Sequence, residues 1–172
     1  MTSIVQEGDP VLRRTAEPVA AAEFGSVELL RLVSDMKDTL AREEDGAALA
    51  APQIGVSKQI FVIAERVFGP TNEEHGSSDP HLVFINPHLT KLSKKKEEMD
   101  EGCLSVRGTY GVIKRANRAT IEAQDEYGKT FIRGAGGLLA QVFQHECDHL
   151  AGTLFTDRAE RTWQAEYPQS GS

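Results

Sequence analysis

Several features that define other protein classes are scarce in this sequence. No apolar run approaches the roughly 18 residues that a membrane-spanning helix needs, and residues 1–10 carry neither a secretion signal nor the Arg-rich bias of a transit peptide. The two cysteines are too few for a disulfide framework. We therefore expect no membrane contact, a cytoplasmic location and reduced thiols.

Positive charge is scarce as well. The 172 residues include 19 Lys and Arg against 26 Asp and Glu, a formal net charge of −7 that repels phosphate backbones. We expect no sequence-specific nucleic-acid partner. Neither repeats nor low-complexity linkers interrupt the chain, so we expect a single domain at 1–167 and a disordered tail at 168–172.

Apolar periodicity and turn residues predict the secondary structure. From residue 27 to residue 40 apolar residues recur at steps of three and four, which predicts a helix at 26–42 with Ser26 as its candidate N-cap. Short β-branched runs predict strands at 59–64, 82–85, 110–113, 119–123 and 130–132. We expect an irregular N-terminal segment at 4–19, an exposed loop at 69–80 and a hairpin connection at 126–129. The charged run at 94–98 is interpreted as a solvated turn or strand edge, with a basic docking patch as the alternative.

A second helix carries the residues with the clearest chemistry. It begins after Gly137 and ends at Gly152, and it holds His145, Glu146 and His149 in the HExxH arrangement of metal-dependent hydrolases. Residues four apart lie on one helix face. Positions 138, 142, 145 and 149 follow one another at steps of four, three and four, which places both imidazoles on the apolar stripe of the helix. The alternative is a pair of core histidines that bond backbone carbonyls.

These elements predict the fold class. We expect an α+β single domain in which antiparallel or mixed β-sheets pack around the central helix that bears the HExxH motif.

Cys103 is the best candidate for a third metal ligand. A catalytic metal site needs three protein ligands and one open position, and a thiolate binds zinc or ferrous iron well. Taken alone, a cysteine such as Cys103 is more often a small core residue than a ligand. Cys147 lies two residues from each histidine, about 200° around the helix, so we interpret it as a packing residue.

A third motif is rich in small residues. The segment from Gly46 to Gln53 reads GAALAAPQ, in which small side chains let the backbone approach a ligand and Gln53 offers an amide donor. By itself this segment is only a turn before a strand.

Together the three motifs resemble those of peptide deformylases. A Gly-rich segment ending in AAPQ precedes EGCLS at 101–105 and QHECDHLAG at 144–152, in the order and with the gaps of that family, and GDPVLR at 8–13 fits as well. The resemblance implies hydrolysis of the N-formyl group from the formylmethionine of new polypeptides. It implies that Cys103, His145 and His149 bind the metal, that Glu146 is the general acid/base, and that Gln53 and the N–H of Leu104 stabilise the oxyanion.

The resemblance also implies further site residues. An apolar pocket for the methionine side chain would be lined by Ala47, Met99, Leu104, Leu138 and Val142. Five more residues would bind substrate: Gly46, Ala48, Glu101, Gly102 and Tyr110. Glu101 and Arg115 would form an ion pair that braces the metal loop, with a surface ion pair as the alternative.

Two positions depart from the family pattern. Ala48 stands where the family usually has glycine, which would cost strain if φ were positive there. Only 20 residues follow Gly152, where bacterial members often carry a basic helix associated with the ribosome. We expect at most a brief helix at 157–166, and therefore a weakened, transient ribosome contact.

Two rival functions use the same residues. A metallopeptidase would normally take its third ligand downstream of the HExxH helix, where no histidine follows. A structural module would use a saturated Cys2His2 site, which Cys147 cannot readily complete from the same helix. The ligand set suits both iron and zinc, and the resemblance favours one Fe(II) per chain, with zinc, nickel or cobalt as alternatives.

Overall fold

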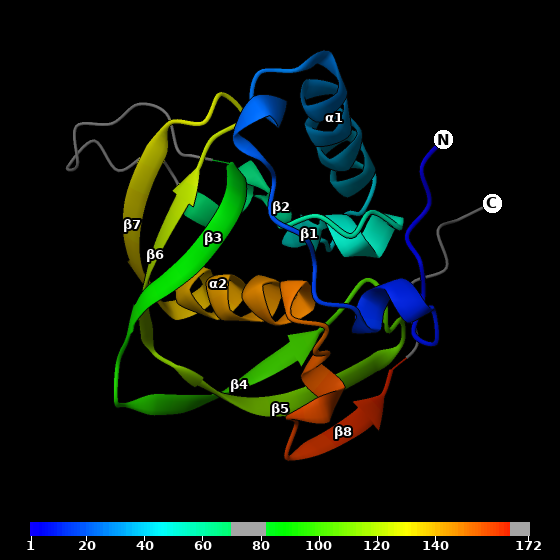
Figure 1. Cartoon of the computed structure of the whole chain (residues 1–172). Helices are drawn as coiled ribbons and strands as arrows, with labels where there is room; N and C mark the ends of the chain where they lie inside the picture. The colour runs from blue at the N-terminus through cyan, green and yellow to red at the C-terminus, as the bar shows by residue number, and fades with distance from the viewer. Residues whose placement is uncertain (70–81, 166–172) are drawn as a thin grey trace.

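Two antiparallel sheets enclose one helix in this structure, a computed structural model that describes residues 1–69 and 82–165. Helix α2 (Gly137–Leu150) contacts strands of both sheets and lies between them (Figure 1). The predicted α+β class and the central position of the HExxH helix are confirmed. None of the described helices is long and apolar enough to cross a membrane.

Helix α1 (Val27–Ala41) covers the five-stranded sheet from outside, where it contacts β1 and β2 (Figure 1). The Ser26 hydroxyl accepts a hydrogen bond from the Leu29 N–H at 3.2 Å, which confirms the predicted N-cap. The buried side chains of α1 face the core: Leu29, Val33, Met36, Thr39 and Leu40.

The larger sheet has the strand order β1-β2-β3-β6-β7. Its strands are β1 (Ala48–Ala50), β2 (Ile60–Ile63), β3 (Val83–Leu92), β6 (Arg118–Gln124) and β7 (Thr130–Gly136). Strand β3 extends well beyond the predicted range 82–85. The prediction ended too early because the second half of the strand is mostly exposed and has no continuous apolar run. The predicted hairpin between β6 and β7 is confirmed.

The smaller sheet has the order β4-β5-β8, with β4 (Lys96–Gly102), β5 (Thr109–Ala116) and β8 (Arg161–Gln164). Residues 94–98 are exposed, as predicted: 94 and 95 lie in the turn before β4, and 96–98 are the first residues of that strand. The expectation of a brief helix at 157–166 is wrong for its described part, since Arg161–Gln164 pairs with β5 as a strand. Nearly all of the loop expected at 69–80, and the tail at 168–172, lie outside the described residues.

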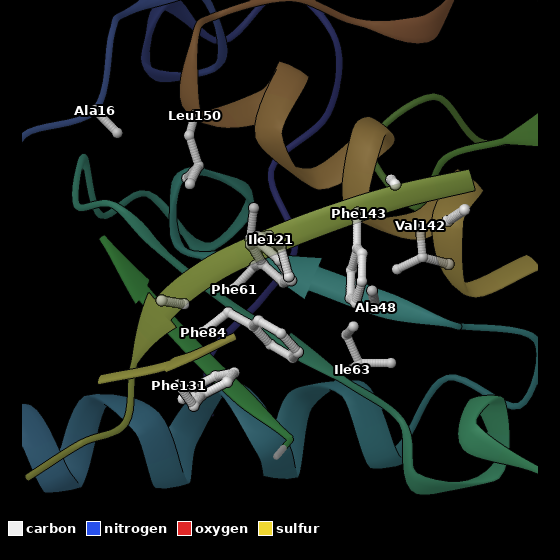
Figure 2. Packing of buried hydrophobic residues seen from close by; sticks show 14 residues of the cluster. Ala16, Ala48, Phe61, Ile63, Phe84, Ile121, Phe131, Val142, Phe143 and Leu150 are labelled. Carbon is white, nitrogen blue, oxygen red and sulfur yellow. The ribbon is translucent and has the colours of Figure 1, made fainter. Parts of the chain in front are cut away.

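An aromatic cluster fixes α2 against the larger sheet (Figure 2). The Phe84 ring stacks on Phe61 at 4.8 Å between centroids, and Phe131 and Phe143 lie 5.3 and 5.4 Å from it. Phe143 belongs to α2 and is fully buried, and removing such a ring typically costs about 3–5 kcal/mol. The cluster thereby fixes the position of the helix two residues before His145.

Gly152 ends α2 and lets the N-terminal segment pack against it. Its φ is +78°, and a Cβ there would lie 2.5 Å from the Arg13 carbonyl oxygen. We expect Gly152→Ala to lower the free energy of unfolding by more than Gly55→Ala does. Gly55 has φ +83° but open space around it, so it should show only the left-handed strain of roughly 1–2 kcal/mol. Urea denaturation measures both, and equal losses would contradict the close approach to Arg13.

Candidate active site

Three potential metal ligands converge where β4 ends beside α2. The Nε2 atoms of His145 and His149 are 3.1 Å apart, and Cys103 Sγ lies 3.3 Å from His149 Nε2. All three ligand atoms lie within 4.8 Å of one another. The structure thus brings together the three residues that the sequence singled out, although Cys103 is 42 positions from His145 along the chain.

The arrangement of these atoms fits one metal ion. Ligands about 2.0–2.3 Å from a tetrahedral ion lie roughly 3.3–3.6 Å from one another. Two of the observed separations, 3.1 and 3.3 Å, are close to this range, and the third is no more than 4.8 Å. Glu101 Oε2 lies 2.9 Å from His145 Nδ1, which leaves Nε2 of that ring facing the other ligands. A thiol and two imidazoles supply three ligands, and the fourth position remains for water or substrate.

Glu101 is the centre of a buried ionic network. The Arg115 guanidinium donates to both Glu101 oxygens at 3.0 and 2.8 Å, and these two side chains are only 3% and 5% exposed. Arg115 also donates to Asp148 at 2.6 Å. Burial alone would raise the pKa of Glu101, but hydrogen bonds from His145 and Arg115 outweigh it and hold that pKa at about 2. The pair is therefore not the surface ion pair of the alternative interpretation.

Glu146 is a buried carboxyl group beside the ligands. It is 3% exposed, its Oε1 lies 3.9 Å from His145 Nε2, and its Oε2 has no hydrogen-bond partner in the described part of the chain. Burial raises the pKa of Glu146 to about 7, although His145 opposes part of the rise. A carboxyl group with a pKa near neutrality can both accept and donate a proton during catalysis.

A cavity of about 240 Å³ opens beside these residues. It is lined by most of the residues predicted to act on substrate: Gly46, Ala47, Ala48, Gln53, Glu101, Gly102, Leu104, Tyr110, Leu138, Val142 and Glu146. Met99 is not among the lining residues, because it lies further back along β4, opposite Ile113. Leu138 is 56% exposed and lines the cavity. The first residue of the apolar stripe of α2 therefore faces the cavity and is not part of the hydrophobic core.

The sequence interpretation missed Gln141. This residue lies one turn before His145 on α2, lines the cavity, and donates to the Asp100 carbonyl at 2.9 Å and to Glu101 Oε1 at 3.2 Å. The spacing 141, 145, 149 on one helix face was the available signal. Gln141 joins the helix to the strand that leads to Cys103.

Gln53 is oriented by bonds at both ends of its amide. Its Oε1 accepts from the Ala50 N–H at 2.9 Å, and its Nε2 lies 3.1 Å from Ser105 Oγ and 3.5 Å from Cys103 Sγ. The N–H₂ group is therefore directed towards the loop that holds Cys103. An amide held in this way is a preorganised hydrogen-bond donor.

Two questions raised by the sequence have clear answers. Asn86 is the only described non-glycine residue with positive φ, so Ala48, an extended residue of β1, carries no left-handed strain. Cys147 packs against the core cluster around Phe143, and burial raises the pKa of its thiol to about 12. Cys147 is therefore the packing residue predicted, and it is not a ligand.

We expect Cys103→Ala to weaken metal binding by more than about 100-fold, since losing a ligand should cost more than losing one of its supporting partners. Cys147→Ala is the matched control and should retain one ion per chain. Equilibrium dialysis with elemental analysis measures both. Full metal content in Cys103→Ala would remove this residue from the ligand set.

Arg115→Ala would leave the Glu101 carboxylate buried without its main partner. We expect a loss of about 3–5 kcal/mol in the free energy of unfolding, measured by chemical denaturation. Lys114→Ala on the same strand removes only the exposed ion pair with Glu160 and should change stability little. Similar stability in the two variants would argue against the buried network.

Comparison with known proteins agrees with this geometry. A model of the family "Polypeptide deformylase" matches residues 1–164. The peptide deformylase of Heliobacterium modesticaldum is 44% identical over 158 residues, covering 91% of this chain and 93% of that protein. The peptide deformylase of Leptospira biflexa is 38% identical over 161 residues, covering 92% and 88%.

Solved structures are similar throughout the chain. The Thermotoga maritima peptide deformylase superposes with a TM-score of 0.79 at 34% identity, covering 94% of this chain and 99% of that one. A class I type b enzyme from Acinetobacter baumannii, solved with Met-Ala-Ser bound, gives a TM-score of 0.80 at 31% identity, covering 92% and 98%. The family match and these relatives, together with the cavity and the Cys-His-His cluster, show that the chain belongs to the polypeptide deformylase family of hydrolases.

Proposed function

We propose that this protein hydrolyses the N-formyl group from the N-terminal formylmethionine of newly made polypeptides and releases formate. The observation that carries the proposal is the convergence of Cys103, His145 and His149 at a cavity, beside the Glu146 carboxyl group, whose Oε2 has no hydrogen-bond partner among the described residues. The related Acinetobacter enzyme binds Met-Ala-Ser, a peptide with the form of a deformylated product.

The proposed metal is one divalent ion held by Cys103, His145 and His149. Ferrous iron is our first choice on family grounds, and zinc, nickel or cobalt would suit the same ligands. When bound, the ion supplies Lewis-acid chemistry by lowering the pKa of water towards about 7 and polarising the formyl carbonyl.

Glu146 moves the proton in the proposed reaction. Its carboxylate accepts a proton from the attacking water while the water oxygen bonds to the formyl carbon. The C–N bond then breaks, Glu146 gives the proton to the leaving amine, and formate separates. A pKa of about 7 suits both steps, because the group exchanges its proton readily near neutral pH.

The other lining residues have positioning roles in this proposal. The Gln53 amide and the Leu104 N–H donate to the oxygen on which negative charge develops, and losing one such donor typically costs about 10²–10³ in rate. Ala47, Leu104, Leu138 and Val142 provide apolar surface for the methionine side chain. Gly46 allows this packing, since a Cβ there would lie 3.2 Å from a Leu104 side-chain atom.

The rival functions fit the described geometry less well. A peptidase of the HExxH type would take its third ligand downstream of the helix, whereas the atom beside the histidines comes from Cys103, upstream of it. A saturated Cys2His2 site is also disfavoured, because Cys147 packs in the core.

The proposed substrate is made on ribosomes, so we propose that the enzyme acts in the cytoplasm. We further propose that any ribosome contact is transient. In the described residues, a 3₁₀ turn at Phe155–Asp157 and strand β8 follow Gly152, with no basic helix among them.

Amine release from formyl-Met-Ala-Ser tests the function. The protein is reconstituted without oxygen with iron or zinc, because a metal-bound thiolate is open to oxidation. We expect turnover with the metal-loaded protein and a loss of about 10²–10⁴-fold in Glu146→Gln at unchanged metal content. Metal-loaded protein that releases peptide fragments, or no amine at all, would contradict the proposal.

A further inference from the structure

Tyr110 forms an aromatic surface at the edge of the cavity. It belongs to β5 and lies opposite Gly102 of β4, and both residues line the cavity. A Cβ at Gly102 would come within 2.8 Å of the Tyr110 ring, so the ring lies directly over this glycine. The absence of a side chain at position 102 is what allows the ring to take this place.

Trp163 extends the same surface outwards. It is the register partner of Tyr110 in the β5–β8 pair, and directly opposite residues of antiparallel strands point to the same face. The two rings stack with centroids 6.4 Å apart and planes inclined by 23°. Trp163 is 39% exposed, so much of its ring remains available for contact.

Strand β8 is firmly attached to the cavity wall. The side chains of Thr109 and Gln164 exchange hydrogen bonds at 3.2 and 3.0 Å, and the Ala165 N–H donates to the Gly108 carbonyl at 2.8 Å. Gly108, Thr109 and Tyr110 all line the cavity. The C-terminal strand therefore holds the Trp163 ring in a fixed position relative to the cavity.

We propose that Tyr110 and Trp163 form an aromatic ledge that binds the substrate residues following formylmethionine, with a preference for apolar side chains there. This inference rests on the proposed function. A peptide whose formyl end lies beside the metal ligands must leave through the mouth of the cavity. Side chains two apart on an extended peptide are separated by about 6.6 Å, close to the 6.4 Å between the two ring centroids.

The ledge acts on binding and not on the chemical step. Trp163 does not itself line the cavity, and it stacks on Tyr110, which does. Aromatic contacts of this kind change binding about 3- to 10-fold. The effect should therefore appear in KM for long substrates, with kcat nearly unchanged.

Substrates of different length and side-chain chemistry distinguish binding by the ledge from binding by the cavity. We compare formyl-Met-Leu-Phe-Leu, formyl-Met-Ser-Ser-Ser and formyl-Met-amide. In the unaltered protein, KM should be lowest for the apolar peptide, and Trp163→Ala should raise that KM about 3- to 10-fold. Trp163→Ala should leave formyl-Met-amide unaffected, and Trp163→Phe should restore most of the binding of the apolar peptide.

Ile132→Ala is the matched control. Ile132 is a large apolar residue that is 67% exposed on β7, in the other sheet, and its loss should change no KM. Equal KM values for Trp163→Ala and the unaltered protein with the apolar peptide would overturn the ledge. Absence of turnover on all three substrates would instead overturn the proposed function.

Trp163 fluorescence gives a second measurement that does not depend on turnover. Trp163 is the only tryptophan in the chain, so its emission reports the ledge directly. In Glu146→Gln, saturating formyl-Met-Leu-Phe-Leu should shift the emission to shorter wavelength, whereas formyl-Met-amide should not. An unchanged spectrum at saturating apolar peptide would overturn the inference, even if Trp163→Ala proved unstable.

Discussion

The buried carboxylate of Glu101 is the constraint on which the site depends. It joins three elements, because it extends from β4, accepts from Arg115 on β5 and orients His145 on α2. A buried charge is costly unless its partners are fixed, so the network ties the smaller sheet to the helix. Cys103 follows Glu101 by two residues and is positioned by the same constraint. Cys103 and His145, two of the three candidate metal ligands, therefore share one support.

The two sides of α2 have different contacts. Phe143 fixes one side of the helix in the aromatic core. Gln141 and His145 face the cavity and the ionic network, and His149 lies beside His145 and Cys103. Glu146 differs from Glu101 in having an oxygen without a hydrogen-bond partner among the described residues, and burial therefore raises its pKa. Two glutamates close together thus acquire opposite properties, since one is paired with Arg115 and the other is not.

Local signals in the sequence were sufficient for much of this structure. Both helices follow from apolar periodicity, Ser26 and Gly152 mark their ends, and the four-residue step between His145 and His149 places both rings on one face. The contacts of Arg115 with Asp148 could not be read in this way, since they depend on how β5 lies against α2. The amphipathic signal was also incomplete, because Leu138 lies on the stripe and is nevertheless exposed at the cavity.

The sequence by itself determined the helices, most of the strands, the two histidines and the family, because these depend on short-range periodicity and on motifs within a few residues. Only the tertiary structure decided that Cys103 lies beside His149, that Met99 stays away from the cavity, and that Trp163 stacks on Tyr110. The physical reason is strand pairing. Register and sheet order are set by hydrogen bonds between residues far apart in the chain, which no local pattern specifies.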